Sequence, residues 1–368
     1  MCVGDLVKNY SYLIKPASSL CNYGCSYCFY HDVADHREVR SSGIMSDEIM
    51  VALISNALNV EDGSMITFAF QGGEPTLAAL AYFRNFISQV ENEKKSSQKV
   101  QYAIQTNGSL IDQEWCDFLF ENKFLVGLSL DGYRKNHDLF RMTRQHQPTY
   151  ERVMESLALL KANHIDFNIL TVLTSELSKH PKELYDFYKE HDYRFVQLIP
   201  CLPGLDGEEN THALKPSEFA SFYKDFYTFW LEDYRKGHYI SVSLFDNIIP
   251  MFRGFPPQQC GMLGFCSPQY VVEADGNVYP CDFYVLDQYI SGNVRSHSFD
   301  QIKNSQIMND FLKEDKRISV LCKDCKFKNL CHGNCKRLNI TYFDDDRCGY
   351  KEFLEFAHVS MMEIAKDI

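Results

Sequence analysis

The sequence has no long hydrophobic run, no excess of basic residues and no internal repeat. No segment approaches the run of about 18 apolar residues that spans a bilayer, and no apolar secretory segment follows Met1. Acidic residues outnumber basic ones by 49 to 37, and the net charge of −12 argues against nucleic acid or an anionic membrane as a partner. We therefore expect a soluble, cytoplasmic protein.

Cysteine, by contrast, is abundant, with 14 in 368 residues. A chain of this length does not need disulfide bonds as staples, and in a reducing cytosol clustered thiols bind metal more often than each other. The hydrophobic fraction of 45% suffices for a packed core, and the length suggests two domains or one barrel with an appendage. Because cysteines concentrate from Cys260 onward, we place the two domains at residues 1–245 and 246–368.

Short β-rich runs alternate with amphipathic helical stretches over the first 240 residues, which is typical of a parallel sheet wrapped by helices. Helices are expected to begin after Ser46, after the cap Asp112 and after Thr149. The predicted fold class is therefore α/β, with six strands in a partial barrel. The strands are expected at residues 12–15, 66–70, 101–105, 125–129, 167–173 and 195–199.

Cysteines, glycines and polar residues gather at the C-terminal ends of four consecutive predicted strands. In parallel α/β barrels the active site lies at this face, because the loops after the strands converge there. The first strand leads into a cysteine-rich loop, and the paired glycines after the second allow positive φ and close approach of the backbone to a ligand. The clusters after the second, third and fourth strands are Gln71-Gly72-Gly73-Glu74-Pro75, Thr106-Asn107-Gly108 and Ser129-Leu130-Asp131-Gly132.

Three cysteines stand close together in the segment CNYGCSYC, at Cys21, Cys25 and Cys28. A cubane iron–sulfur cluster normally takes four thiolates, so three leave one iron open to a small molecule. The segment resembles the loop of radical S-adenosylmethionine (SAM) enzymes, in which the amino and carboxylate groups of SAM chelate the open iron and Tyr27 is the aromatic residue of the pattern. A disulfide knot and a zinc site are the alternatives, and the composition argues against the first.

Eight cysteines follow from residue 260 onward, enough for two complete four-thiolate sites. A hairpin that turns at residues 274–277 precedes Cys281. Spacing alone would group Cys322, Cys325, Cys331 and Cys335, and two structural zinc sites are the alternative to iron. The layout resembles the auxiliary-cluster (SPASM) domain of peptide-modifying radical SAM enzymes. That resemblance assigns one 4Fe–4S cluster to Cys260, Cys266, Cys281 and Cys335, and another to Cys322, Cys325, Cys331 and Cys348.

Over nearly its whole length the chain resembles anaerobic sulfatase-maturating enzymes, in the segments LIKPASSLCNYGCSYCFYHD, AFQGGEPTLA, QTNGSLID, ENKFLVGLSLDG and VYPCDFYVLD. The resemblance implies a partial (β/α)6 barrel of the TIM type, SAM and three 4Fe–4S clusters. It also implies oxidation of a cysteine or serine of a sulfatase polypeptide to Cα-formylglycine, at a motif of the form Cys/Ser-x-Pro/Ala-x-Arg. A 5′-deoxyadenosyl radical from SAM would take a hydrogen atom from Cβ of the target residue, and the protein would then remove one proton and one electron.

The same resemblance implies roles for individual residues. Asp282 would accept the proton, because it follows the cluster ligand Cys281, and burial beside a negatively charged cluster would favour proton uptake. A plain turn residue is the alternative for Asp282. Tyr30 would line the substrate pocket, and Arg141, with Arg144 as the nearby alternative, would bind the carboxylate of SAM. The expected SAM contacts are Tyr27, Gln71, Gly72, Gly73, Glu74, Thr106, Asn107, Ser129, Asp131 and Arg141.

Two other functions stay open. A radical SAM maturase of ribosomal peptides, forming a thioether or a carbon–carbon crosslink, is the second enzyme hypothesis; such enzymes usually carry an N-terminal peptide-binding domain, and only 20 residues precede Cys21. A zinc-stabilised interaction module is the non-enzyme hypothesis. The expected electron donor is a protein such as flavodoxin or ferredoxin, and the expected state is a monomer. Cys2, Cys116 and Cys201 receive no ligand role.

Overall fold

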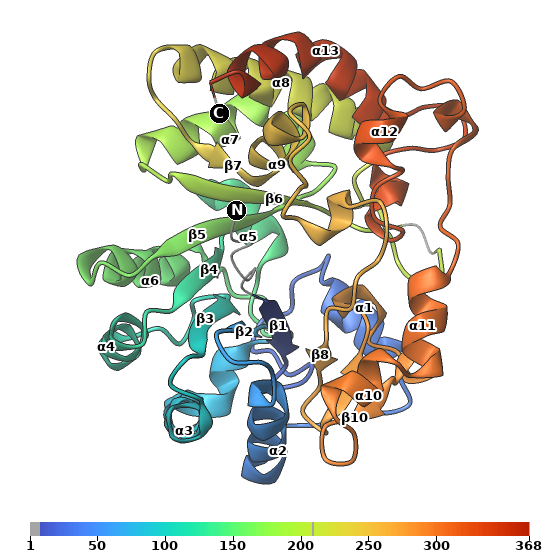
Figure 1. Cartoon of the computed structure of the whole chain (residues 1–368). Coiled ribbons are helices and arrows are strands. Elements are labelled where there is room, and N and C mark those ends of the chain that lie inside the picture. Colours follow the sequence, from blue (N-terminus) through green and yellow to red (C-terminus); the bar gives the residue numbers. More distant parts are fainter. Residues whose placement is uncertain (1–7, 208–209, 368) are drawn as a thin grey trace.

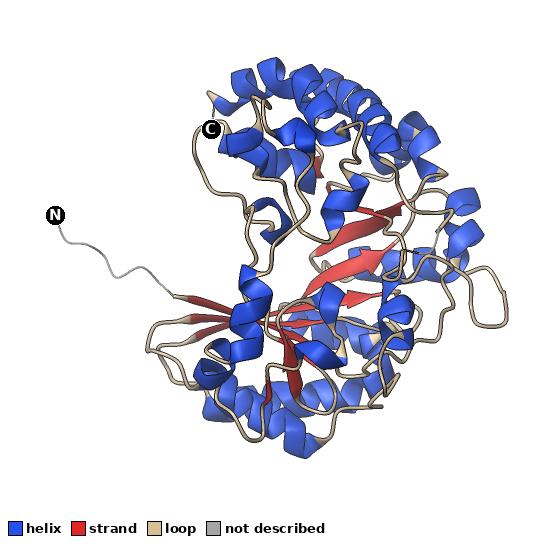
Figure 2. Ribbon diagram, turned by 90° about the vertical axis from the view of Figure 1, so that its right-hand side faces the viewer, coloured by secondary structure: helices blue, strands red, loops and turns tan. Residues whose placement is uncertain are grey.

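A ten-stranded sheet forms the centre of the computed structural model, which describes residues 8–207 and 210–367 (Figure 1). Six parallel strands, β1 to β6, pair with their neighbours in chain order. Helices lie outside this curved sheet, whose strands form the inner wall (Figure 2). The predicted α/β fold is confirmed, and the six strands are Asn9–Ile14 (β1), Met65–Phe70 (β2), Lys99–Thr106 (β3), Leu125–Ser129 (β4), Phe167–Leu173 (β5) and Phe195–Pro200 (β6).

The helices begin close to the predicted positions. The side chain of Ser46 accepts a backbone N–H from the first turn of α2, and that of Asp112 accepts one from α4 at 2.9 Å. Thr149 precedes α6 without capping it, since its hydroxyl donates to the carbonyl of Arg141 at 2.6 Å. None of the helices in the described residues has the length and apolar character to cross a bilayer. They are Phe29–Asp35 (α1), Asp47–Leu58 (α2), Ala79–Glu93 (α3), Gln113–Glu121 (α4), Arg134–Phe140 (α5), Tyr150–Ala162 (α6), Pro181–Glu190 (α7), Pro216–Arg235 (α8), Ser243–Met251 (α9), Phe299–Lys303 (α10), Gln306–Lys313 (α11), Lys328–Cys331 (α12) and Gly349–Ala365 (α13).

Four short strands extend the sheet at its two edges. The predicted hairpin is present: β8 and β9 pair antiparallel around a turn in which Gly276 has a φ of +85°. β8 also pairs parallel with β1, Leu13 opposite Val271 and Ile14 opposite Val272, a contact that the sequence analysis did not foresee. This pairing joins the C-terminal segment to the first strand of the barrel. The four strands are Ser241–Val242 (β7), Val271–Val272 (β8), Asn277–Tyr279 (β9) and Gly292–Asn293 (β10).

The last helix, α13, returns to the barrel and packs along α8 at the top of Figure 1. The ring of Phe353 lies 5.6 Å from that of Tyr223 between ring centroids. A Cβ atom at Gly349, the first residue of α13, would lie only 1.9 Å from the carbonyl oxygen of Pro216. Glycine is therefore required at this close approach, which fixes the position of the preceding residue, Cys348.

Candidate active site and auxiliary thiol cavities

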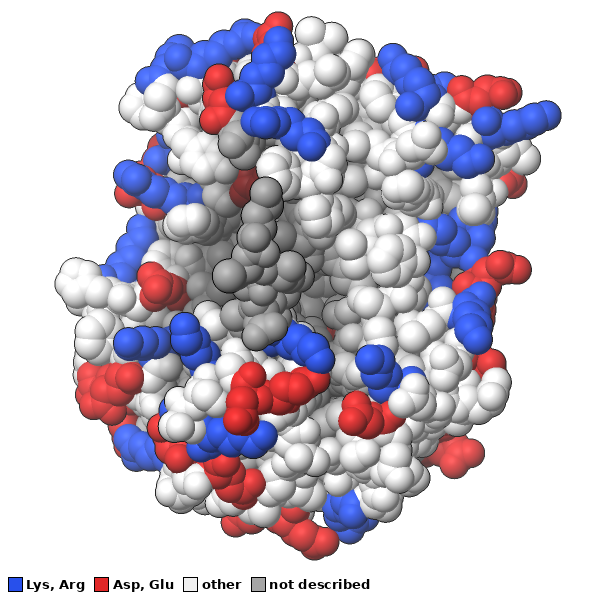
Figure 3. Space-filling view, in the orientation of Figure 1, with Lys and Arg blue, Asp and Glu red and all other residues white. Residues whose placement is uncertain are grey.

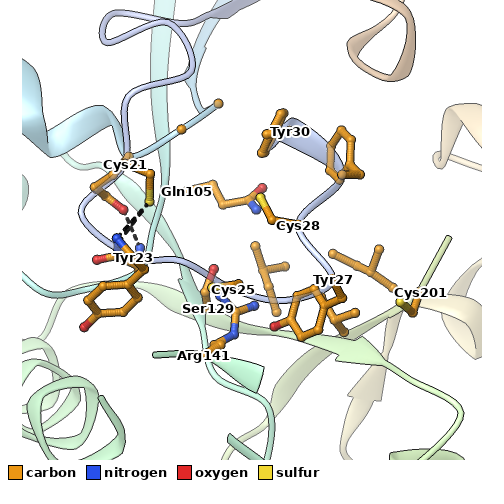
Figure 4. Close-up of a pocket in the computed structure, with 18 of the residues that line it drawn as sticks. Cys21, Tyr23, Cys25, Tyr27, Cys28, Tyr30, Gln105, Ser129, Arg141 and Cys201 are labelled. Atoms are coloured by element: carbon orange, nitrogen blue, oxygen red, sulfur yellow. Dashed lines mark hydrogen bonds between the residues drawn. The ribbon is translucent and has the colours of Figure 1, made fainter. Parts of the chain in front are cut away.

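A cavity of about 900 Å³ opens at the C-terminal ends of the barrel strands (Figure 4). Cys21, Cys25 and Cys28 line it, so we call it the loop cavity. Two of the expected SAM contacts, Gln71 and Asp131, are not among its lining residues. The other expected contacts and the expected substrate residue do line it: Tyr27, Gly72, Gly73, Glu74, Thr106, Asn107, Ser129, Arg141 and Tyr30.

Backbone hydrogen bonds hold the cysteine loop between β1 and α1. The amide of Tyr23 donates to Cys21 Sγ at 3.4 Å, and two further loop amides donate to the carbonyls of Phe140 and Met142. Burial raises the pKa of Cys21 to about 11 and that of Cys25 to about 12. Bare thiols here would stay protonated near neutral pH, so a metal group is what would stabilise them as thiolates.

The paired glycines after β2 lie directly against the cysteine loop. Gly72 and Gly73 have φ values of +88° and +53°. A Cβ atom at Gly73 would lie 2.2 Å from the carbonyl oxygen of Leu20, and one at Gly72 would lie 2.7 Å from Cγ of Lys15. Side chains are excluded at both positions, which lets the amide of Glu74 donate to the carbonyl of Leu20 at 2.7 Å.

Glu74 is a carboxylate buried beside this loop, with 1% of its surface exposed. It accepts hydrogen bonds from the hydroxyls of Thr76 and Thr106, at 2.6 and 2.7 Å, and from the amide of Asn107 at 2.7 Å. These partners are all neutral. Burial raises the pKa of Glu74, and the hydrogen bonds only oppose that effect. A cation in the cavity would stabilise the carboxylate, so the amino group of SAM fits this position.

Arg141 and Asp131 form a buried ion pair at the edge of the loop cavity. Nε of Arg141 lies 2.9 Å from Oδ2 of Asp131, and the hydroxyl of Tyr27 donates to the same oxygen. Nε faces Asp131, and no acceptor among residues 8–207 and 210–367 is recorded for the other N–H groups of Arg141, which could therefore bind a ligand carboxylate in the cavity. Arg144, the alternative, instead donates from Nε to the carbonyl of Cys21 at 2.9 Å.

Asp282 lies at the junction between the C-terminal segment and the barrel. Its Oδ2 accepts hydrogen bonds from the hydroxyl of Tyr30 at 2.7 Å and from Nε2 of Gln71 at 2.8 Å. Gln71 also donates to the hydroxyl of Tyr30 at 3.1 Å. Tyr30 lines the loop cavity, so the carboxylate is one hydrogen bond away from it. Gln71, expected to contact SAM, is thus turned toward Asp282.

Lys15 is a site residue that the sequence reasoning missed. Its ammonium lies 3.0 Å from Oδ1 of Asp282 and 4.5 Å from the centre of the Tyr30 ring, and its side chain is 4% exposed. The ammonium and the carboxylate therefore form a largely buried ion pair. A signal was present in the sequence, because Lys15 directly follows β1 at the face where the other special residues gather.

The eight C-terminal cysteines line two further cavities. The structure separates Cys335 from Cys331, as the SPASM resemblance implies and spacing alone does not. No group of three or more His, Cys, Asp or Glu side chains in residues 8–207 and 210–367 is placed to hold a single metal ion. The thiols instead surround open space of about 920 and 950 Å³. The first auxiliary cavity is lined by Cys260, Cys266, Cys281 and Cys335, and the second by Cys322, Cys325, Cys331 and Cys348.

The remaining cysteines differ in their surroundings. Cys116 is fully buried in α4, whereas Cys201 follows β6 and lines the loop cavity. Both are free thiols, as are the eleven cysteines that are expected to be cluster ligands. Cys2 lies outside the described residues.

Comparisons with known proteins match this arrangement. Family models match the Radical SAM superfamily at residues 16–188 and the iron–sulfur cluster-binding SPASM domain at residues 265–326. The cysteine-type anaerobic sulfatase-maturating enzyme of Clostridium perfringens is 40% identical over 97% of this chain and 99% of its own length. The solved structure of native anSMEcpe with bound AdoMet superposes with a TM-score of 0.91 at 39% identity, covering 98% of this chain and all of the other. The same protein with AdoMet and the Kp18Cys peptide gives a TM-score of 0.90 at 39% identity over 98% of this chain and 100% of that one.

The resemblance seen in the sequence is therefore confirmed over both parts of the molecule. The chain belongs to the family of anaerobic sulfatase-maturating enzymes and is a radical SAM enzyme with a SPASM domain, which uses SAM, a 4Fe–4S cluster and additional iron–sulfur clusters.

Proposed function

We propose that this enzyme oxidises a cysteine of a sulfatase polypeptide to Cα-formylglycine, and that it carries three 4Fe–4S clusters. The observation that carries the proposal is the position of Asp282, held by Lys15, Tyr30 and Gln71 next to the loop cavity. The cysteine-type relative and the peptide bound by anSMEcpe support the choice of a cysteine target. A serine target stays the alternative within the same reaction.

The loop cavity provides the groups that SAM and its cluster need. Cys21, Cys25 and Cys28 would hold the cluster, Glu74 would pair with the amino group of SAM, and Arg141 with Ser129 would bind its carboxylate. When bound, this cofactor pair supplies a 5′-deoxyadenosyl radical that takes one hydrogen atom from Cβ of the target residue. The protein's part is to hold both reactants in one water-poor cavity.

Asp282 would take the second hydrogen of the target, as a proton from its thiol. The ammonium of Lys15 and the donors on Tyr30 and Gln71 fix the direction of the carboxylate. One electron must leave the substrate at the same stage, and Cys281, the residue before Asp282, would hold a cluster able to accept it. The resulting thioaldehyde reacts with water to give formylglycine and sulfide.

The remaining parts of the proposal concern partners and organisation. An acidic carrier such as flavodoxin or ferredoxin would reduce the loop cluster, and the enzyme would act as a monomer on a Cys-x-Pro-x-Arg segment. Residues 1–245 would form the radical SAM domain and residues 246–368 the SPASM domain. The net charge of −12 favours approach of a target that carries arginine.

The decisive experiment is mass spectrometry of a peptide with Cys-x-Pro-x-Arg after anaerobic incubation with SAM and dithionite. Exchange of sulfur for oxygen with loss of two hydrogens, and a product that reacts with a hydrazide, are expected. A matched serine peptide should react more slowly. A mass loss of two hydrogens without a trappable aldehyde would favour the crosslinking maturase instead. Colourless protein that contains zinc and no iron would support the interaction module.

A further inference from the structure

Lys316 lies between the two auxiliary cavities. It lines both of them, and so do Gly264 and Ile318. Its ammonium donates to three backbone carbonyls, those of Gly264 at 2.6 Å, His332 at 2.5 Å and Asn334 at 2.9 Å. An ammonium has three N–H groups, so all of its donors are used by the two loops that face it.

The carbonyls come from loops that carry proposed cluster ligands. Gly264 precedes Cys266 by two residues, and His332 to Asn334 connect Cys331, in the second auxiliary cavity, with Cys335, in the first. His332, Gly333 and Asn334 all have left-handed backbone conformations, with φ values of 46°, 77° and 52°. Two of these three are not glycine, so the conformation needs support from its surroundings. The ammonium of Lys316 provides that support by binding two of their carbonyls.

No carboxylate neutralises this lysine in the ion pairs of the described residues. Lys336, which lines only the first auxiliary cavity, is paired with Glu314 at 2.5 Å, whereas the partners of Lys316 are carbonyl oxygens. Burial lowers the pKa of Lys316, and negative charge on the nearby cysteines acts in the opposite direction. Those cysteines come from both cavities: Cys266, Cys331, Cys335 and Cys322.

We propose that Lys316 is a positive charge shared by the two auxiliary clusters, which raises the reduction potential of both. The inference rests on the proposed function, because it requires a cluster in each auxiliary cavity. Reduction adds one negative charge to a cluster, and a fixed positive charge nearby stabilises the reduced form. Because the same ammonium faces both cavities, its removal should affect the two clusters together.

The test is an anaerobic redox titration of the reconstituted holoenzyme, followed by electron paramagnetic resonance. In Lys316→Met the midpoint potentials of both auxiliary clusters should become more negative, while the potential of the loop cluster stays unchanged. Lys316→Arg keeps the charge, so both auxiliary potentials should stay close to those of the wild type. Lys328→Met is the matched control: Lys328 is exposed and lines only the second auxiliary cavity, so its loss should produce a smaller shift in one cluster.

Iron content distinguishes a lost charge from a lost fold. If Lys316→Met retains its iron and both auxiliary potentials equal those of the wild type, the proposal is overturned. If that variant loses iron, Lys316→Gln replaces it, because its amide can still donate to the loop carbonyls without a charge; unchanged potentials in Lys316→Gln then overturn the proposal as well. The proposed function fails separately, if the wild-type enzyme lacks auxiliary cluster signals or forms no formylglycine.

Discussion

Cysteine thiols line the loop cavity and both auxiliary cavities. The number of thiols expected to bind a cluster and the groups that surround them differ between the two kinds of cavity. The three thiols of the cysteine loop line the loop cavity, together with the buried Glu74, the guanidinium of Arg141 and two glycines, while Cys201 reaches this cavity separately from the end of β6. Four thiols line each auxiliary cavity, and the charged group between those two is an ammonium bound to carbonyls. A cubane cluster with three protein ligands can bind a small molecule, whereas one with four can only exchange electrons. In the proposed enzyme, the missing fourth ligand of the cysteine loop would thus separate a ligand-binding centre from two electron carriers.

Asp282 joins these two regions. It follows Cys281 of the first auxiliary cavity in the chain, and its side chain contacts Lys15, Tyr30 and Gln71 of the barrel. The surface charges do not indicate this junction, because acidic and basic side chains are mixed over the face shown in Figure 3. In the proposed reaction, proton removal and electron removal would therefore occur side by side, near the place where β8 pairs with β1.

The largest effect is expected from loss of a loop thiol. Cys25→Ala leaves only two thiols in the cysteine loop, so cluster binding and SAM cleavage should both be lost. 5′-Deoxyadenosine, measured by chromatography, should fall below detection. Cys116→Ala is the control, since this buried thiol of α4 lies in none of the three cavities and its loss should cost about 1 kcal/mol of stability at most. SAM cleavage at wild-type rate by Cys25→Ala would refute the distinction between the cavities.

Asp282→Asn should uncouple SAM cleavage from formylglycine formation. The amide keeps the shape of the side chain but cannot take a proton, so formylglycine formation should fall by about 10²- to 10⁴-fold while SAM cleavage continues. The ratio of 5′-deoxyadenosine to product, measured in one reaction, gives the uncoupling directly. Asp287→Asn serves as a control in the same segment, because that carboxylate accepts the amide of Glu38 at 2.8 Å instead. A full product yield from Asp282→Asn would show that another group is the base.

A smaller effect is expected from a change in a residue that would bind SAM in the loop cavity. Glu74→Gln removes the charge opposite the amino group of SAM but keeps acceptors for Thr76 and Thr106. Charge-assisted hydrogen bonds contribute about 1.5–3 kcal/mol, so the Kd of SAM should rise about 10- to 100-fold. Anaerobic titration calorimetry on the reconstituted enzyme measures this. Iron content and auxiliary potentials should stay as in the wild type, since the change concerns the loop cavity alone.

The sequence predicted those parts of the molecule that local patterns determine. Alternating β-rich and amphipathic runs gave β1 to β6, and the glycine-containing turn gave the β8–β9 hairpin. The pairing of β8 with β1 could not be read in the same way, because it involves two residues of each strand that lie far apart in the chain. Such a contact depends on tertiary packing and leaves no periodic signal.

The candidate site shows the same limit. The residues at strand ends are all near the loop cavity, as the barrel rule predicts, but the direction of each side chain is set by its neighbours. Gln71 and Asp131 are themselves outside the cavity lining, because their side chains bind Asp282 and Arg141. Lys15 escaped notice because a lysine at a strand end is usually solvated, and only the fold shows that this one is buried.

Lys15→Met should have the smallest effect of the four substitutions, and it tests how Lys15 acts on Asp282. Methionine keeps the apolar part of the side chain against Gly72 and Tyr30 but removes the ammonium beside Asp282. The carboxylate keeps the donors on Tyr30 and Gln71, so kcat for formylglycine should fall only about tenfold, which corresponds to about 1.4 kcal/mol. Lys15→Arg should recover part of this loss if charge is the cause. Equal loss in Lys15→Arg and Lys15→Met would instead show that the fit of the lysine against Gly72, rather than its charge, positions Asp282.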